Sequence, residues 1–157
     1  MTTHETWMAQ AFREAEKALK RQEVPIGAVI VVDGKIVGRG YNMVETLQDP
    51  TAHAEMIAIT AAANSLGSWR LDEATLYVTK EPCPMCAGAI FLSRISHVVF
   101  GVSDSRMGAC GSTLNVLQNS ELHSQVKVTF GILESKCLGI LQTFFRQLRQ
   151  KEKDSER

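Results

Sequence analysis

Two short motifs constrain how this chain can fold. The first is His53-Ala54-Glu55, and the second, about 30 residues later, is Pro82-Cys83-Pro84-Met85-Cys86. Together they supply one imidazole, two thiols and one carboxylate, which makes three good zinc ligands and one proton carrier. Three protein ligands leave one tetrahedral position free for water, as catalytic zinc sites do and structural ones do not. A fold that uses all four side chains has to bring the two motifs to one point.

The local sequence allows that convergence. Asp49-Pro50-Thr51 indicates a helix start just before His53. His53 and Glu55 lie about 200° apart on a regular helix, but the first turn is irregular enough for both to reach one site. Cys83 and Cys86 share one helix face. They also stand at an expected helix N-terminus, where the partial positive charge favours thiolates.

The length of 157 residues fits a single compact domain, and the charged stretch 151–157 is expected to fray. No apolar run approaches the roughly 18 residues of a membrane span, and the N-terminus does not resemble a signal peptide, so a cytoplasmic protein is expected. Four cysteines, two of them isolated, do not form the pattern of a disulfide scaffold. The 17 basic and 17 acidic residues cancel, so evidence for a nucleic-acid partner has to be local.

Hydrophobic periodicity and turn residues predict an α/β fold. It is a three-layer α-β-α arrangement, in which helices flank a mixed five-stranded sheet on both faces. The expected elements, in chain order, are a helix at about 5–22, strands at 28–32 and 35–41, a helix at 52–66, a strand at 74–79, a helix at 83–92, a strand at 98–101, a loop at 107–112, a strand at 126–130 and a helix at 133–150.

The joint pattern H-x-E with P-C-x-x-C is the signature of zinc deaminases that act on nucleobases. Zinc lowers the pKa of bound water to about 7, so hydroxide is available to attack the amine-bearing ring carbon. Glu55 is then the residue that takes and delivers protons. The parts alone are ambiguous: a lone C-x-x-C also fits dithiol redox chemistry. A structural zinc site would need a fourth ligand, for which the sequence offers His97, His123, Cys110 and Cys137.

From roughly Trp7 to Arg149 the chain resembles the bacterial tRNA-specific adenosine deaminases (TadA type) of the cytidine-deaminase-like superfamily. The segments that carry the resemblance include Glu23–Ala28, Gly40–Asn42, Asp49–Glu55, Ala74–Thr79, Glu81–Cys83, Met85–Ala89, Ser93–Ile95, Val98–Gly101 and Phe144–Arg146. The two metal motifs are shared across the superfamily. The first and the last of these segments are more typical of the tRNA branch.

The resemblance implies a homodimer that hydrolyses the wobble adenosine (position 34) of a tRNA anticodon stem-loop to inosine and releases ammonia. It implies one Zn²⁺ per subunit on His53, Cys83 and Cys86, with water or hydroxide as fourth ligand and Glu55 as catalytic residue. Neither a membrane nor DNA is expected as a partner. The residues expected to contact substrate are Asn42, Ala54, Asp104, Phe144, Phe145, Arg146 and Arg149.

Several of these assignments have ordinary structural alternatives. Asn42 can be a turn residue that ends a strand, and Asp104 can be a loop or cap aspartate. Phe144 and Phe145 can stack on unpaired bases or simply fill the core, and the arginines beside them can meet phosphates or form a solvated face.

Three other functions compete with deamination of tRNA. Pro84 is also familiar from guanine deaminases, so deamination of a free base or nucleotide, such as guanine or cytosine, is the nearest rival. A non-enzymatic RNA-binding or structural zinc module is the rival of a different class, but it gives Glu55 and an open fourth position no role. A dithiol oxidoreductase gives neither His53 nor Glu55 a role.

Overall fold

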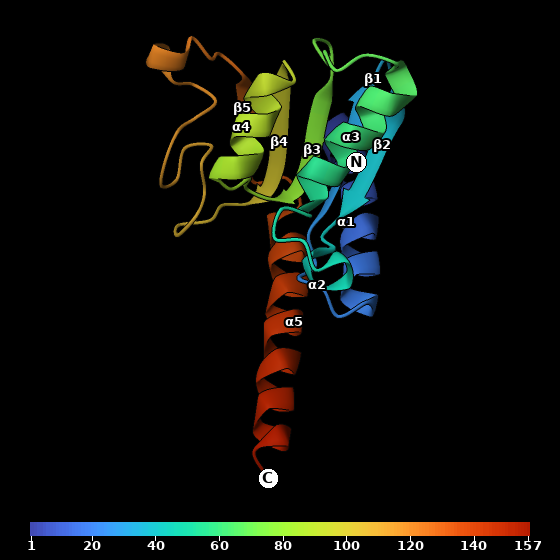
Figure 1. The fold of residues 1–157 in the computed structure, drawn as a ribbon, viewed down its shortest axis with the longest axis vertical. Helices are drawn as coiled ribbons and strands as arrows, with labels where there is room; N and C mark the ends of the chain where they lie inside the picture. Colours follow the sequence, from blue (N-terminus) through green and yellow to red (C-terminus); the bar gives the residue numbers. More distant parts are fainter.

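The computed structural model describes all 157 residues, in which five strands form one sheet in the order β2-β1-β3-β4-β5. Helices cover both faces of this sheet (Figure 1). The predicted three-layer α-β-α architecture is therefore confirmed. The elements are α1 Thr3–Lys20, β1 Gly27–Val32, β2 Lys35–Tyr41, α2 Val44–Leu47, α3 Ala54–Leu66, β3 Thr75–Lys80, α4 Pro84–Leu92, β4 His97–Val102, the short 3₁₀ turn η1 Ser120–Leu122, β5 Lys127–Thr129 and α5 Glu134–Ser155.

The sheet is mixed, as predicted. A hairpin joins β1 to β2, and its Asp33-Gly34 turn has positive φ at both residues, as a tight two-residue turn requires. β1 also pairs antiparallel with β3, whereas β3, β4 and β5 run parallel to one another. The carboxyl ends of β3 and β4 therefore lie at the same edge of the sheet.

Alternate side chains of the central strands pack into two separate hydrophobic cores. Ile30, Leu76 and Val98 point into the core beneath α3 and α4. Val29 and Val99 point the other way, into a smaller core beneath α1 and α5. Both faces of these strands are thus buried, which explains their continuous apolar composition.

A close approach of α3 to β2 fixes the height of that helix above the sheet. A Cβ at Gly40 would lie 2.4 Å from the carbonyl oxygen of Ala54, and a Cβ at Gly38 would lie 2.4 Å from that of Ala58. Only glycine leaves room for the helix backbone at these distances. The first turn of α3, which carries Glu55 and directly follows His53, is therefore held against β2.

Three features differ from the sequence-based expectations or add to them. α1 spans Thr3–Lys20, whereas residues 5–22 were expected. The short elements α2 and η1 were not predicted. α5 continues to Ser155, five residues past the predicted end, and its C-terminal half projects beyond the rest of the molecule (Figure 1). All of residues 151–157 are exposed, and their fraying stays a prediction. None of the helices combines the length and the apolar composition that crossing a bilayer would require.

Candidate metal centre and substrate pocket

The two motifs lie at two helix starts. His53 is the N-cap of α3 and Cys83 is the N-cap of α4, both with extended backbone. His53 thus precedes the first helical turn in which it was expected. Pro84 occupies the first helical position of α4, where its missing N–H has no intrahelical acceptor to lose. Before α3, the Asp49 carboxylate accepts a hydrogen bond from the Thr51 N–H at 2.8 Å, which fixes the turn leading into His53.

The three candidate ligand atoms converge. His53 Nδ1 lies 3.5 Å from Cys83 Sγ and 3.4 Å from Cys86 Sγ, and all three ligand atoms lie within 4.8 Å of one another. Zinc bonds of about 2.0–2.1 Å to nitrogen and 2.3 Å to sulfur give a tetrahedral N···S edge of about 3.6 Å. The observed spacing therefore fits a tetrahedral metal with three protein ligands. This is the one group of three such side chains in the structure.

Ionisation of the two thiols also suits a metal. A hydrogen bond with Cys86, together with smaller effects of His53, lowers the pKa of Cys83 to about 4 against the opposing effect of burial. The same Cys83 contact, together with burial, raises the pKa of Cys86. The hydrogen bond to Cys83 raises the pKa of His53 against the opposing effect of its burial. Before metal binding, the pair therefore carries one thiolate that is stabilised by neighbouring donors, and a cation would stabilise the second.

Glu55 lies in the first turn of α3 beside this group. Its side chain is buried, and burial raises the pKa of its carboxyl to about 7. A carboxyl with a pKa near neutrality can both accept and release a proton at physiological pH. Glu55 is not needed to complete the ligand set, so it remains available for that role.

A pocket of about 800 Å³ opens over the metal ligands. Its volume is ample for a nucleoside, and its wall combines apolar side chains with a comparable number of polar and charged ones. Eight of the side chains that were expected to act in the site line it or lie at its floor: Asn42, His53, Ala54, Glu55, Cys83, Asp104, Phe144 and Phe145. Cys86 belongs to the metal group but is fully buried behind the pocket.

Asn42 directly follows β2, and its amide faces two segments of the pocket wall. Its Oδ1 accepts from the Val44 N–H at 3.3 Å, and its Nδ2 donates to the Val24 carbonyl at 3.4 Å. Both bonds are long, so the amide retains capacity to donate to and accept from a bound base. The turn role and the binding role of Asn42 are therefore compatible.

The C-terminal helix divides its predicted residues between two cavities. Phe144 and Phe145 line the main pocket, with Phe145 40% exposed, so at least this ring is not core. Arg146 and Arg149 do not line that pocket. They line an adjoining cavity of about 600 Å³, together with Lys80 and Arg106. Asp104 borders both cavities and pairs with Lys80 at 3.2 Å.

Two buried carboxylates beside the pocket were missed by the sequence reading. Glu23 accepts hydrogen bonds from the Glu45 and Thr46 N–H groups and so holds α2. Glu81 accepts from the segment that follows β4. The sequence gives neither residue a role of its own, because their hydrogen-bond partners lie more than 20 residues away. The position of Glu81 directly before Pro82-Cys83 was the one available indication.

The comparisons with known proteins agree with this geometry. A model of the MafB19-like deaminase family matches residues 2–149. A tRNA-specific adenosine deaminase from Bacillus subtilis (strain 168) is 52% identical over 153 residues, which cover 98% of this chain and 95% of the relative.

Two solved structures are also similar. One, from biochemical and structural studies of A-to-I editing by tRNA:A34 deaminases at the wobble position, has a TM-score of 0.83 and 42% identity, and the match covers 86% of this chain and 98% of that one. A guanine deaminase from Bacillus subtilis has 41% identity and a TM-score of 0.63, with 71% of each chain covered. With the family model spanning nearly its whole length, this chain belongs to the MafB19-like deaminase family and groups there with the tRNA-specific adenosine deaminases.

Proposed function

We propose that this protein hydrolyses the wobble adenosine of a tRNA anticodon stem-loop to inosine and releases ammonia. The observation that carries the proposal is the joint placement of three metal-ligand atoms and the buried Glu55 carboxyl at the floor of one pocket of nucleoside size. The similarity to tRNA-specific adenosine deaminases over nearly the whole chain supports adenosine as the target.

His53, Cys83 and Cys86 are the residues that would hold zinc. When bound, zinc would supply the acidification of a water molecule. Glu55 would take a proton from that water, deliver it to the ring nitrogen beside the reacting carbon, and protonate the departing ammonia. Its pKa of about 7 suits all three transfers, since each needs a group that can change protonation state near neutral pH. Asn42 would orient the base, and Ala54 would form part of the surface against which the base lies.

Features around the pocket support an RNA substrate over a free base. The pocket adjoins the second cavity, and the two share three lining residues, Lys80, Asp104 and Phe145. That second cavity presents four cationic side chains, Lys80, Arg106, Arg146 and Arg149, against Asp104. A flipped base in the first cavity would thus have cations nearby for its flanking phosphates, and Phe144 or Phe145 for stacking. A free base would use only the first cavity.

The set of ligands also argues against a purely structural zinc module. The convergent group holds three His or Cys side chains, and His97, His123, Cys110 and Cys137 are not among them. A structural site needs four protein ligands, whereas a catalytic site keeps one position open. The buried Glu55 beside the group has a role only in the second case.

We further propose that the protein acts as a homodimer. It exposes large apolar side chains on α4 and in the loop that follows β4, with Leu92 66%, Met107 56% and Leu114 52% exposed. Exposed apolar side chains of this size are common at subunit interfaces. Light scattering of wild type and Leu92→Lys tests this: the variant is expected to shift toward the monomer, and a monomeric wild type would refute the proposal. A tRNA substrate also implies a cytoplasmic location, which cell fractionation would test.

A substrate panel tests the proposed function. Zinc-loaded protein would be given an adenosine-34 anticodon stem-loop, the same stem-loop with guanosine at position 34, a DNA version of the stem-loop, free adenosine, guanine and cytidine, and ammonia release would be followed. Turnover of the adenosine-34 RNA alone is expected. Turnover of guanine or cytidine without turnover of the RNA would show that the enzyme acts on free bases instead. Absence of any turnover with zinc fully bound would favour the structural module.

A further inference from the structure

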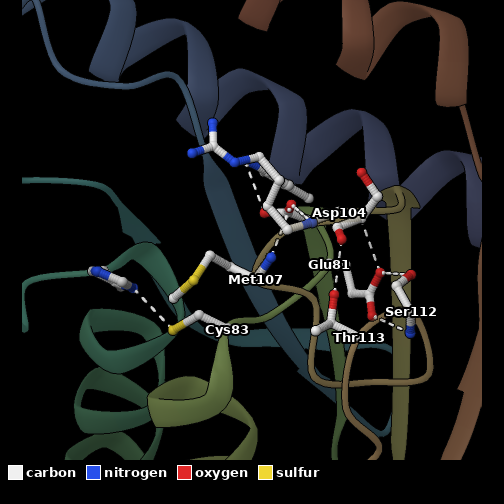
Figure 2. A network of polar contacts seen from close by, with 10 residues as sticks. Glu81, Cys83, Asp104, Met107, Ser112 and Thr113 are labelled. Atoms are coloured by element: carbon white, nitrogen blue, oxygen red, sulfur yellow. Dashed lines mark hydrogen bonds and ion pairs between the residues drawn. The ribbon is translucent and has the colours of Figure 1, made fainter.

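Glu81 is a buried carboxylate with no cationic partner. Its side chain is only 4% exposed, and none of the four ion pairs of the structure includes it. Four donors from one segment surround it instead. Oε1 accepts from the Asp104 N–H at 3.0 Å and from the Ser112 hydroxyl, and Oε2 accepts from the Cys110 N–H at 3.0 Å and the Ser112 N–H at 3.2 Å. Figure 2 shows the carboxylate between Asp104 and Ser112.

The segment held in this way, residues 103–113, forms part of the pocket wall. It contributes Asp104 and Met107 to the lining, and Figure 2 shows the Met107 side chain directed toward the Cys83 side of the site. The segment contains no helix or ladder strand, only one isolated bridge between Cys110 and Asn115. Besides the Glu81 bonds, its main-chain link to the metal motif is the Ala109 N–H bond to the Pro82 carbonyl at 2.9 Å. Main-chain bonds within the segment, such as that from the Gly108 N–H to the Asp104 carbonyl at 2.9 Å, shape its turns, and the Glu81 carboxylate holds these turns against the end of β3.

Asp104, whose N–H donates to Glu81, makes a second set of hydrogen bonds within the segment. The Asp104 carboxylate accepts from the Arg106 and Met107 N–H groups at 2.9 and 3.2 Å. The position of Met107 is thus set by Asp104, whose main chain is in turn held by Glu81. A displacement of the Glu81 carboxylate would therefore also displace Asp104 and Met107, the two residues of the segment that line the pocket.

Gly108 provides independent evidence of how tightly the carboxylate fits. A Cβ at Gly108 would lie 2.5 Å from both Cδ and Oε1 of Glu81, and 2.4 Å from the Asp104 carbonyl oxygen. The segment therefore folds over the carboxylate with no room for a methyl group. The same contact can be disturbed from either side, by changing the carboxylate or by changing the glycine.

We propose that Glu81 is a positioning residue for substrate binding, which acts through the 103–113 segment by fixing Asp104 and Met107 on the pocket wall. The inference rests on the proposed function and assigns a role that the reaction chemistry does not require. A glutamine of equal size would not replace the carboxylate, because its NH₂ group would face N–H or O–H donors already aimed at that position. Since the segment lines the pocket and carries neither metal ligand nor proton carrier, we expect its displacement to raise KM more than it lowers kcat.

Two variants and two matched controls test this. Glu81→Gln and Gly108→Ala disturb the contact from its two sides. Glu73→Gln, at an exposed residue, and Gly139→Ala, where a Cβ meets no atom within 4 Å, repeat the same chemical changes elsewhere. Ser112→Ala removes a single hydroxyl donor and provides a milder disturbance that keeps the fold. The measurements are steady-state kinetics with the adenosine-34 stem-loop, zinc stoichiometry, and hydrogen exchange of peptides from residues 103–113.

Both Glu81→Gln and Gly108→Ala are expected to raise KM roughly tenfold, to change kcat less than about threefold, and to speed exchange of the 103–113 segment roughly tenfold. Ser112→Ala should raise KM about two- to threefold, while zinc stoichiometry stays at the wild-type value in every variant. The two controls should match wild type in KM and exchange.

Unchanged KM with faster exchange would overturn the proposal, because Glu81 would then be structural only. Loss of zinc and of kcat at unchanged KM would also overturn it, since Glu81 would then support the metal motif. The proposed function fails separately, if wild type turns over a free base and not the stem-loop. In that case the same KM shift measured with that base would still support the positioning role, and its absence would refute it.

Discussion

Nδ1 of His53 lies 3.4 Å from Sγ of Cys86, although 33 residues separate the two in the chain. The contact joins the N-cap of α3 to the first turn of α4, and it is bridged in sequence only by α3 and β3. The spacing matches the N···S edge of a tetrahedral zinc site, about 3.6 Å.

Removal of metal by a chelator should expose one cysteine selectively. Cys83 is half-buried with a pKa lowered to about 4 by its contact with Cys86, whereas Cys86, Cys110 and Cys137 are buried. Iodoacetamide at neutral pH is expected to modify Cys83 first in chelated protein and to leave zinc-loaded protein unmodified, as read by peptide mass spectrometry. Equal labelling with and without metal, or first labelling at Cys110, would contradict the ligand assignment.

Substitution of Gly40 by alanine should displace the start of α3. The added Cβ would lie 2.4 Å from the Ala54 carbonyl oxygen, which is helix backbone and cannot move alone. A loss of about 1–3 kcal/mol in unfolding free energy is expected from denaturant titration, together with weaker zinc binding, because His53 directly precedes that turn. Gly139→Ala, in open space on α5, serves as control and should leave both quantities near wild type or slightly stabilise the helix. A fully stable Gly40→Ala protein with normal zinc affinity would refute this account of the helix position.

The strands and the metal ligands could be predicted from the sequence alone, whereas α2 and Glu81 could not. Strand positions could be predicted because short β-branched runs such as Val29–Val32 favour strands. The metal ligands could be predicted because few chemistries use these residue types at this spacing. Helix α2 was not predictable, since its four residues lack periodicity and are held by Glu23 from 22 and 23 positions away. Glu81 could not be assigned a role for the same reason, because its partner Ser112 lies 31 residues away and contacts it only in the folded chain.

Acidification should destabilise the protein partly through His97. Burial, with smaller effects of Lys127 and His4, lowers the pKa of His97 in the fold below its ordinary value near 6.5. The unfolded chain therefore binds the proton first, so the stability contribution is complete above pH 6.5 and declines as pH falls toward the folded pKa. His97→Gln should show a smaller fall in melting temperature between pH 8 and pH 5.5 than wild type. The matched change His123→Gln, at an exposed histidine, should preserve the wild-type pH dependence; identical pH dependence in the His97 variant would disprove the prediction.

Arg149 should contribute to RNA affinity through charge. It lines the second cavity with Lys80, Arg106 and Arg146, where phosphates flanking a flipped base are expected. Arg149→Ala should weaken stem-loop binding most at low salt and reduce the slope of log affinity against log salt by about 1. Filter binding across a salt series measures both effects. Arg13→Ala, an exposed arginine on α1, should leave the slope unchanged, and an unaltered slope in the Arg149 variant would remove this residue from the phosphate contacts.

The proposed mechanism requires Glu55 to move protons for a reaction carried out beside the His53, Cys83 and Cys86 group. The most direct measurement is inosine formation at position 34 of full-length tRNA by Glu55→Gln under single-turnover conditions, with zinc stoichiometry determined on the same sample. We expect wild-type zinc content with deamination slowed by a factor on the order of 10²–10⁴. Deamination at the wild-type rate with zinc fully bound would contradict it, and so would loss of zinc from the variant, because Glu55 would then be a ligand.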